Sequence, residues 1–146
     1  MYQKALVAVD GSPSSLKAVE TAYQLMKYGV LEEVTLLCVV HYPMPAIVGE
    51  GAIDMNLPAE YFQVLRDGAQ QVIEQASKQM ESSPNVNWQI ESGNPPDVIL
   101  EVARKGKYDL IIIGNRGLNQ FQRLFMGSVS SKVISLAHCP VLLIKS

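Results

Sequence analysis

Two pairs of small residues in the second half of the chain could bind a phosphate group. Gly114 and Gly117 stand three residues apart, and Gly127 and Ser128 follow after nine intervening residues. Glycine lets main-chain N–H groups approach an anion, and the free N–H groups at the start of a helix attract negative charge. The hydroxyls of Ser128 and Ser130 could add donors. This spacing predicts a phosphate-binding loop, although turn-forming glycines and a helix-capping serine would produce the same pattern.

Asp10 is a polar residue at a second position suited to ligand binding. It follows a short apolar run at residues 4–9, as Gly114 follows another at residues 110–113. Such runs predict buried parallel strands, and ligands in open α/β sheets bind beyond the carboxyl ends of these strands. A carboxylate there could accept hydrogen bonds from ribose hydroxyls or hold a phosphate-bound Mg²⁺. Because Asp-Gly is a common turn dipeptide, a purely local role is the alternative.

The residues named above must be positioned by strands and helices, which are predicted to alternate along the chain. Apolar runs predict strands, and apolar residues at three- and four-residue steps predict helices. The residues at 86–90 alternate apolar and polar, which is typical of a strand near the edge of a sheet. We expect strands at residues 4–9, 34–40, 86–90, 110–113 and 140–144, and helices at residues 13–29, 59–80, 98–106 and 129–137.

This alternation predicts an α/β fold: one domain, residues 1–146, with an open five-stranded parallel sheet and helices on both faces, as in Rossmann-like proteins. If the first and fourth strands are neighbours, the strand order is 3-2-1-4-5. Asp10 then lies beside the glycine loop, where the winding direction of the sheet reverses.

The segment at residues 41–58 is too long for an ordinary connection, with three prolines and two glycines. Because it follows the carboxyl end of a strand, it could lie over a ligand site. An irregular surface excursion fits the same residues.

Composition narrows the class of partner. The 146 residues carry a net charge of -2 with both signs scattered, which argues against a nucleic-acid surface or an electrostatic membrane anchor. The chain has no apolar stretch near the ~20 residues of a membrane span and no recognisable signal peptide, so we expect a cytoplasmic protein. Its partners are then small molecules or other proteins.

Common catalytic and metal-binding motifs are missing from the sequence. It has no GxxxxGK[ST], no GxGxxG after the first strand and no GxSxG. Its two cysteines, Cys38 and Cys139, form no CxxC pair, and its two histidines lie far apart. We therefore expect two reduced, buried thiols, no assembled catalytic residues and no metal site made from protein ligands alone.

The full spacing resembles a known family motif. Gly114-Asn115-Arg116-Gly117, nine residues and Gly127-Ser128 are similar to the GxxG, nine-residue spacer, G[ST] pattern of universal stress proteins, specifically their ATP-binding branch. The segments VAVDGS, PPDVILEVARKGKYDLIIIG and HCPVLLIK also resemble that family, so the similarity covers nearly the whole chain.

The resemblance implies the 3-2-1-4-5 sheet and a bound ATP, with Mg²⁺ accompanying the phosphates. The adenine would contact Ala8, Asp10 and Val39, with Asp10 near the ribose. The residues implied at the phosphates are Ile113, Gly114, Gly117, Gly127, Ser128, Val129 and Ser130. It also implies a homodimer through the last strand, Val141–Ile144, and an apolar edge strand has an independent physical motive to pair.

The leading hypothesis for function is an ATP-binding regulatory protein of the stress response, acting through an unknown protein partner. A slow ATPase or a self-phosphorylating phosphotransferase is the alternative, although no general base aimed at a γ-phosphate is evident. A receiver-like phosphoacceptor is a further alternative. It lacks the expected paired acids after the first strand, where Asp10 stands alone.

Overall fold

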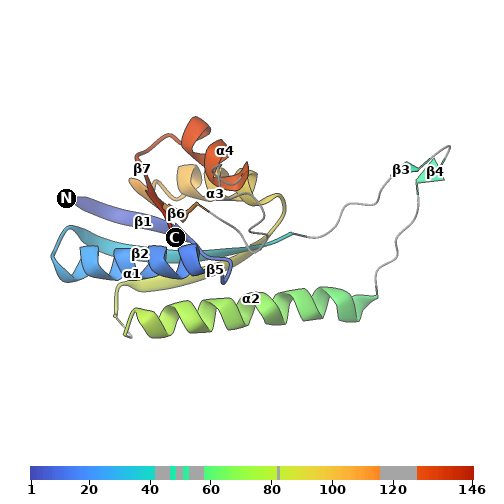
Figure 1. Ribbon diagram of the computed structural model, residues 1–146, viewed down its shortest axis with the longest axis horizontal. Coiled ribbons are helices and arrows are strands. Elements are labelled where there is room, and N and C mark those ends of the chain that lie inside the picture. The colour runs from blue at the N-terminus through green and yellow to red at the C-terminus, as the bar shows by residue number, and fades with distance from the viewer. Residues whose placement is uncertain (42–46, 49–50, 53–57, 82, 116–127) are drawn as a thin grey trace.

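The protein folds around a five-stranded parallel sheet (Figure 1). The structure is a computed structural model that describes residues 1–41, 47–48, 51–52, 58–81, 83–115 and 128–146. The strand order is β5-β2-β1-β6-β7, and every neighbouring pair is parallel. When the five strands of this sheet are numbered one to five along the chain, their order is 3-2-1-4-5, and the prediction is confirmed. The strands are β1 Tyr2–Ala8, β2 Leu31–Val40, β5 Val86–Ser92, β6 Leu110–Gly114 and β7 Val141–Ile144.

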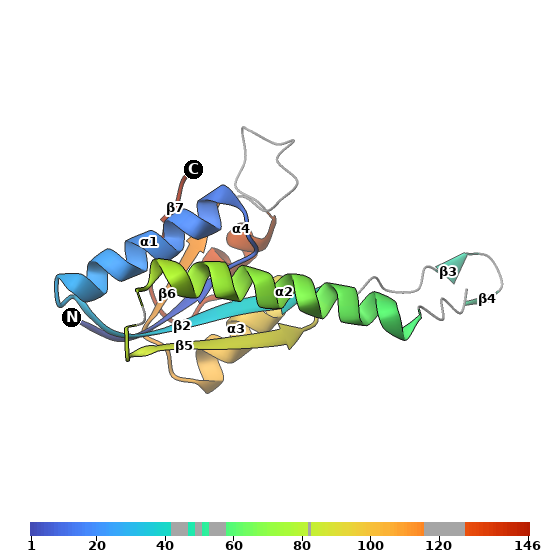
Figure 2. The same cartoon turned by 90° about the horizontal axis from the view of Figure 1, so that it is seen from below.

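Helices cover both faces of this sheet (Figures 1 and 2). On one face, α1 and α2 lie side by side, and α3 and α4 cover the other. Successive strand residues point to opposite faces, so Ala5 and Val7 pack with α1 and α2 while Leu6 packs with α3 and α4. The helices are α1 Pro13–Lys27, α2 Ala59–Gln79, α3 Pro95–Lys105 and α4 Ser128–Leu136.

Most predicted boundaries differ from the observed ones by one or two residues, and the two largest errors have identifiable reasons. β2 begins at Leu31, three residues before the prediction, because Leu31 pairs with Tyr2 at the start of β1. The helix α3 begins at Pro95 rather than at residue 98. Proline is well tolerated in the first helical turn, where an N–H group would have no intrahelical acceptor, so Pro95 and Pro96 start the helix.

The two outer strands of the sheet are β5 and β7. The edge position predicted for residues 86–90 is therefore confirmed. Within the long segment at residues 41–58, the structure describes one short antiparallel pair, β3 Ile47–Val48 and β4 Gly51–Ala52. Among the described helices, none has the length and apolar character needed to cross a membrane.

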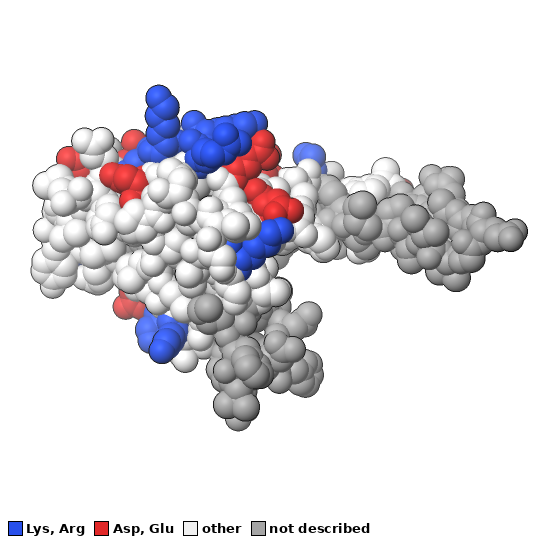
Figure 3. Space-filling model, turned by 90° about the horizontal axis from the view of Figure 1, so that it is seen from above, with Lys and Arg blue, Asp and Glu red and all other residues white. Residues whose placement is uncertain are grey.

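Charged side chains of both signs lie close together on the face seen in Figure 3. Glu101 pairs with Lys105 along α3 at 2.7 Å, and Asp97 of α3 pairs with Lys132 of α4 at 2.7 Å. Both pairs are well exposed, so each contributes little to stability. The mixed charge on this face agrees with the scattered signs in the sequence.

Candidate functional site

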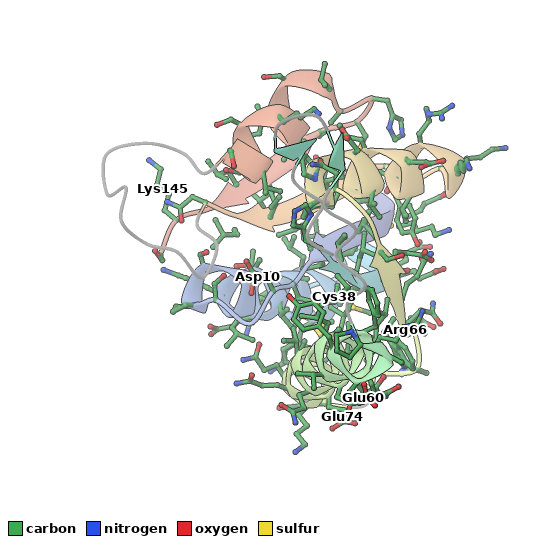
Figure 4. The ribbon with its side chains drawn as sticks, turned by 90° about the vertical axis from the view of Figure 1, so that its right-hand side faces the viewer. Asp10, Cys38, Glu60, Arg66, Glu74 and Lys145 are labelled. Carbon is green, nitrogen blue, oxygen red and sulfur yellow. The ribbon has the colours of Figure 1, made fainter. Side chains whose placement is uncertain are left out.

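The carboxyl ends of β1 and β6 meet at the point where the winding of the sheet reverses. These strands are direct neighbours, with Val7 opposite Ile112. From β1 the chain proceeds to β2 on one side, whereas β6 and β7 lie on the other. Asp10 follows β1 and Gly114 ends β6, so the fold brings both predicted residues to this end. Figure 4 shows Asp10 there, at the start of α1.

Gly114 packs directly against the first turn of α1. A Cβ atom at this position would lie 2.5 Å from Ser14 Oγ and 2.7 Å from the carbonyl carbon of Ser14. No other residue type fits without a shift of the helix or the strand. Packing therefore requires glycine at position 114 whether or not a ligand binds. The same contact joins the turn after β1 to the beginning of the glycine loop.

Asp10 has a local role in the turn that starts α1. Its Oδ1 accepts a hydrogen bond from the Ser12 N–H at 2.9 Å, and its own N–H donates to Ser15 Oγ at 3.3 Å. Ser12 is the N-cap, and its hydroxyl accepts from the Ser15 N–H at 3.3 Å. The Asp10 side chain is nevertheless exposed, so it is accessible to a ligand.

Asp10 also acts electrostatically on Cys38, which lies near the carboxyl end of β2; both are labelled in Figure 4. Burial, and then the negative charge of Asp10, raise the pKa of the Cys38 thiol to about 11. The thiol is therefore neutral at physiological pH. Cys38 and Cys139 are both free; the predicted burial is confirmed for Cys38 and is wrong for Cys139, which is only half-buried.

The apolar residues predicted at the site share one face of the sheet. Ala8, Val39 and Val129 are half-buried, and all three pack against the cluster formed with α3 and α4. Ile113 belongs to the same cluster but is only 4% exposed, so its backbone is the part that can reach a ligand. Three strands and one helix thus contribute neighbouring apolar side chains at this end of the molecule.

The start of α4 supplies polar groups near the same end. Ser128 is the first residue of the helix and is exposed, whereas Ser130 is only 2% exposed. The N–H groups of a first helical turn have no intrahelical acceptor and can bind an anion. Two further predicted residues, Gly117 and Gly127, lie outside the described residues.

Asn115, the residue after Gly114, is hydrogen-bonded to the end of β7 and to Ser146. Gly114 pairs with Ile144, and the Asn115 N–H donates to the Ile144 carbonyl oxygen at 2.9 Å. Asn115 Oδ1 accepts from the Ser146 N–H at 3.4 Å. Lys145, exposed between these two contacts, brings a positive charge to this end of the sheet (Figure 4).

Sequence reasoning did not predict the serines of the first α1 turn as part of this end. Ser12 and Ser14 are fully buried and Ser15 is 4% exposed. The usable signal was the sequence Asp-Gly-Ser-Pro-Ser-Ser directly after a strand, which places several hydroxyls at one helix start. The contact between Ser14 and Gly114 could not be read from it, because the two residues are far apart in the chain.

Both histidines contact backbone carbonyl oxygens. His41 Nδ1 lies 3.3 Å from the Gly93 oxygen, and His138 Nε2 lies 3.1 Å from the Tyr108 oxygen. Within the described ranges, no group of three or more His, Cys, Asp or Glu residues could hold a metal ion.

The sequence as a whole matches the model of one family, described as the universal stress protein family, over residues 1–145. The chain belongs to the universal stress protein family. Two curated relatives support this assignment. Universal stress protein MJ0531 of Methanocaldococcus jannaschii is 30% identical over 99% of this chain and 83% of its own length. Universal stress protein YxiE of Bacillus subtilis is 30% identical over 99% of this chain and all of its own length.

Solved structures share the fold of this universal stress protein. The hypothetical protein MJ0577 superposes with a TM-score of 0.79 at 26% identity, covering 100% of this chain and 97% of that one. Two others, both 23% identical, show the fold alone. A universal stress protein in complex with cAMP has a TM-score of 0.72 over 98% and 97% of the two chains. An Arabidopsis thaliana family member with AMP bound has a TM-score of 0.64 over 98% and 91%.

The sheet order argues against the receiver-like alternative. Receiver domains have the order 2-1-3-4-5, in which the third strand lies next to the first. In this universal stress protein the third long strand, β5, lies at the edge beside β2, and the fourth, β6, lies next to β1.

Proposed function

We propose that this protein binds ATP beyond the carboxyl ends of β1, β2 and β6 and acts as a regulatory protein of the stress response. The observation that carries the proposal is the spacing of Gly114, Gly117 and Gly127-Ser128 on a segment that leaves β6 beside β1 and reaches the start of α4. Ligands in open α/β sheets bind at this position.

The apolar residues at this end suit a flat base. Ala8 and Val39 are half-buried neighbours on adjacent strands, and Val129 packs against the same cluster. Burying the faces of an aromatic base against such side chains is favourable, because it removes apolar surface of both from water. The exposed carboxylate of Asp10 follows β1, the strand between β2 and β6, and would accept hydrogen bonds from ribose hydroxyls there.

The phosphates would lie between the end of β6 and the start of α4. There the backbone N–H groups of Ser128, Val129 and Ser130 and the positive end of the helix dipole favour an anion. Ser128 has an exposed hydroxyl that adds a donor, whereas the buried Ser130 contributes chiefly its N–H group. Gly117 and Gly127 complete the proposed loop.

A Mg²⁺ ion would accompany the triphosphate. In the part of the chain that the structure describes, no cluster of three or more suitable side chains could hold it. The ion would therefore take its ligands chiefly from phosphate oxygens and water, as Mg²⁺ commonly does. Its role here is to neutralise phosphate charge.

Two structures of the same fold support a nucleotide as ligand, since they contain cAMP and AMP. The chemistry of the site favours regulation over catalysis. Phosphoryl transfer to water or to a hydroxyl needs a group that positions the nucleophile in line with the γ-phosphate. The residues assigned to the phosphate end supply N–H groups and hydroxyls, which bind phosphate but accept no proton at neutral pH.

The proposal includes a homodimer through β7. This strand is at the edge of the sheet, and Val141, Leu143 and Ile144 are only half-buried in the single chain. An unpaired apolar edge strand tends to associate with other chains unless it is covered. A second copy related by a two-fold axis covers it.

Acid extraction of the purified protein, followed by chromatography of the released nucleotide, tests the proposal. We expect ATP, and we expect it unchanged after incubation with Mg²⁺. Rapid release of ADP, or ³²P transfer from γ-labelled ATP to the protein, would instead support the ATPase or the phosphotransferase. If no nucleotide is released and calorimetry detects no ATP binding, the proposal is wrong.

A further inference from the structure

Glu91 is a half-buried carboxylate near the end of β5. Its Oε1 accepts a hydrogen bond from Gln89 Nε2 at 2.7 Å. Of the ion pairs formed among the described residues, none includes Glu91. Removing a carboxylate from water is unfavourable unless donors replace the lost water, and a single neutral amide replaces little of it.

Glu91 lies on the surface that would receive the base. It is the direct sheet partner of Val39, and Gln89 is the direct partner of Leu37. Leu37 and Val39 both pack in the cluster under α3 and α4. Paired residues of a parallel sheet point to the same face, so Glu91 lies beside Val39 on the face that also carries Ala8.

We infer, on the basis of the proposed function, that Glu91 determines base specificity by accepting a hydrogen bond from the exocyclic amino group of adenine. β5 lies two strands from β1, about 10 Å at the usual strand spacing. If a base that contacts Ala8 and Val39 points its amino edge toward β5, Glu91, the sheet partner of Val39, is the carboxylate that this edge meets. An ionised carboxylate only accepts hydrogen bonds, so it favours a base edge with an amino group over one without.

Gln89 is the positioning residue for this contact. Its amide holds one oxygen of Glu91 from two residues earlier on the same face. With one carboxylate oxygen fixed, the other is held in a limited range of positions. Charge-assisted hydrogen bonds of this type are stronger than neutral ones. A base without an amino group would leave the Glu91 carboxylate without its partner, and this cost increases the preference for adenine.

The test changes the Glu91 side chain and the 6-amino group of the base separately and together, and compares the affinities. Affinities of the full-length protein for ATP and for purine riboside triphosphate, which lacks only the 6-amino group, are measured by calorimetry with Mg²⁺. Wild-type protein is expected to prefer ATP by about tenfold or more. In Glu91→Met, which keeps the length of the side chain but has no carboxylate, the two affinities become equal. Glu91→Gln keeps a weaker neutral acceptor and is expected to retain part of the preference.

Glu33→Met is the matched control. Glu33 is also half-buried on the sheet and accepts a hydrogen bond from an amide, Asn87 Nδ2, at 3.3 Å, but it lies toward the amino end of β2. This variant should keep the full preference for ATP. If Glu91→Met and Glu91→Gln both bind ATP with the wild-type preference, the inference about Glu91 is wrong while the proposed function stands. If the wild-type protein binds neither nucleotide, the proposed function fails and this inference with it.

Discussion

Gly114 and Ser14 are in such close contact that the end of β6 and the first turn of α1 form one packed unit. A Cβ atom at Gly114 would lie 2.5 Å from Ser14 Oγ and 2.8 Å from Ser14 Cβ. The glycine that starts the proposed phosphate loop therefore also fixes the position of α1 and of the Asp10 turn before it.

Gly114→Ala is expected to lower the free energy of unfolding by about 1–3 kcal/mol, because the added methyl group overpacks this contact. Urea denaturation measures the change. Gly68→Ala is the control: Gly68 lies within α2 with nothing within 4 Å of an added Cβ. Alanine there should raise the stability by roughly 0.5–1 kcal/mol, since it favours the helix. Equal stability of Gly114→Ala and the wild type would contradict the packing argument.

Asp10→Asn should separate the two roles of this residue. The asparagine oxygen can still accept from the Ser12 N–H, so stability should change by less than about 0.5 kcal/mol. The affinity for ATP should fall about tenfold, because a neutral amide is a weaker acceptor for ribose hydroxyls.

Asp10→Ala removes both roles and should lose stability as well as affinity. Calorimetric titration with ATP and urea denaturation give the two quantities for each variant. An Asp10→Asn protein with wild-type affinity for ATP would remove Asp10 from the proposed site.

Several features at this end of the sheet could be predicted from the sequence, and others could not. Asp10 and Gly114 stand at the carboxyl ends of buried strands, and the order 3-2-1-4-5 was predicted on the condition that these strands are neighbours, as the family resemblance implies. The edge position of β5 followed from its alternating residues. The starts of β2 and α3 were missed, because pairing with Tyr2 and the tolerance of proline in a first turn outweigh local apolar patterns.

The individual contacts could not be predicted. That Ser14 would lie against Gly114, or Glu91 beside Val39, depends on how the completed sheet sets the register of its strands and the position of α1. Spacing in the sequence carries no such information for residues that are fifty to a hundred positions apart. The glycine pattern pointed to a ligand, whereas the packing reason for Gly114 emerged only from the structure.

Asp109 should contribute to stability in a pH-dependent way. Burial alone would raise the pKa of this carboxyl, but hydrogen bonds from the N–H groups of Gln3 and Lys4, both 2.9 Å, outweigh it and hold the pKa below its ordinary value of 3.8. A depressed pKa in the folded state stabilises the protein above the unfolded-state pKa. This contribution is lost as the pH falls below about 4 and through the folded-state pKa.

Asp109→Asn is therefore expected to cost about 1–2 kcal/mol at pH 7, and the difference from wild type should shrink at pH 3. Urea denaturation at the two pH values measures it. Asp67→Asn serves as the control, because Asp67 is an exposed residue of α2 that accepts only a side-chain hydrogen bond from Gln63. A constant difference at both pH values would show that Asp109 does not act through its charge.

Cys38 should resist alkylation in the folded protein. Burial and the charge of Asp10 raise its pKa to about 11, so the reactive thiolate is rare at pH 7.5. Burial and then the charge of Asp109 raise the pKa of Cys139 too, but this thiol is only half-buried. Iodoacetamide should therefore modify Cys139 first and Cys38 only after denaturation, as peptide mass spectrometry can measure. Labelling of Cys38 in native protein at the denatured rate would contradict this.

The proposed dimer predicts that the two edges of the sheet respond differently to a charge. Leu142 on β7 is 37% exposed and Trp88 on β5 is 54% exposed in the single chain. If β7 pairs with its copy across a two-fold axis, Leu142→Arg brings two like charges to the interface and should give a monomer. Trp88→Arg, a matched change on the opposite edge, should leave the dimer intact. Sedimentation velocity at micromolar concentration distinguishes these masses, and a wild-type mass equal to one chain would exclude the dimer. A dimer that survives Leu142→Arg but not Trp88→Arg would move the interface to β5, next to Glu91.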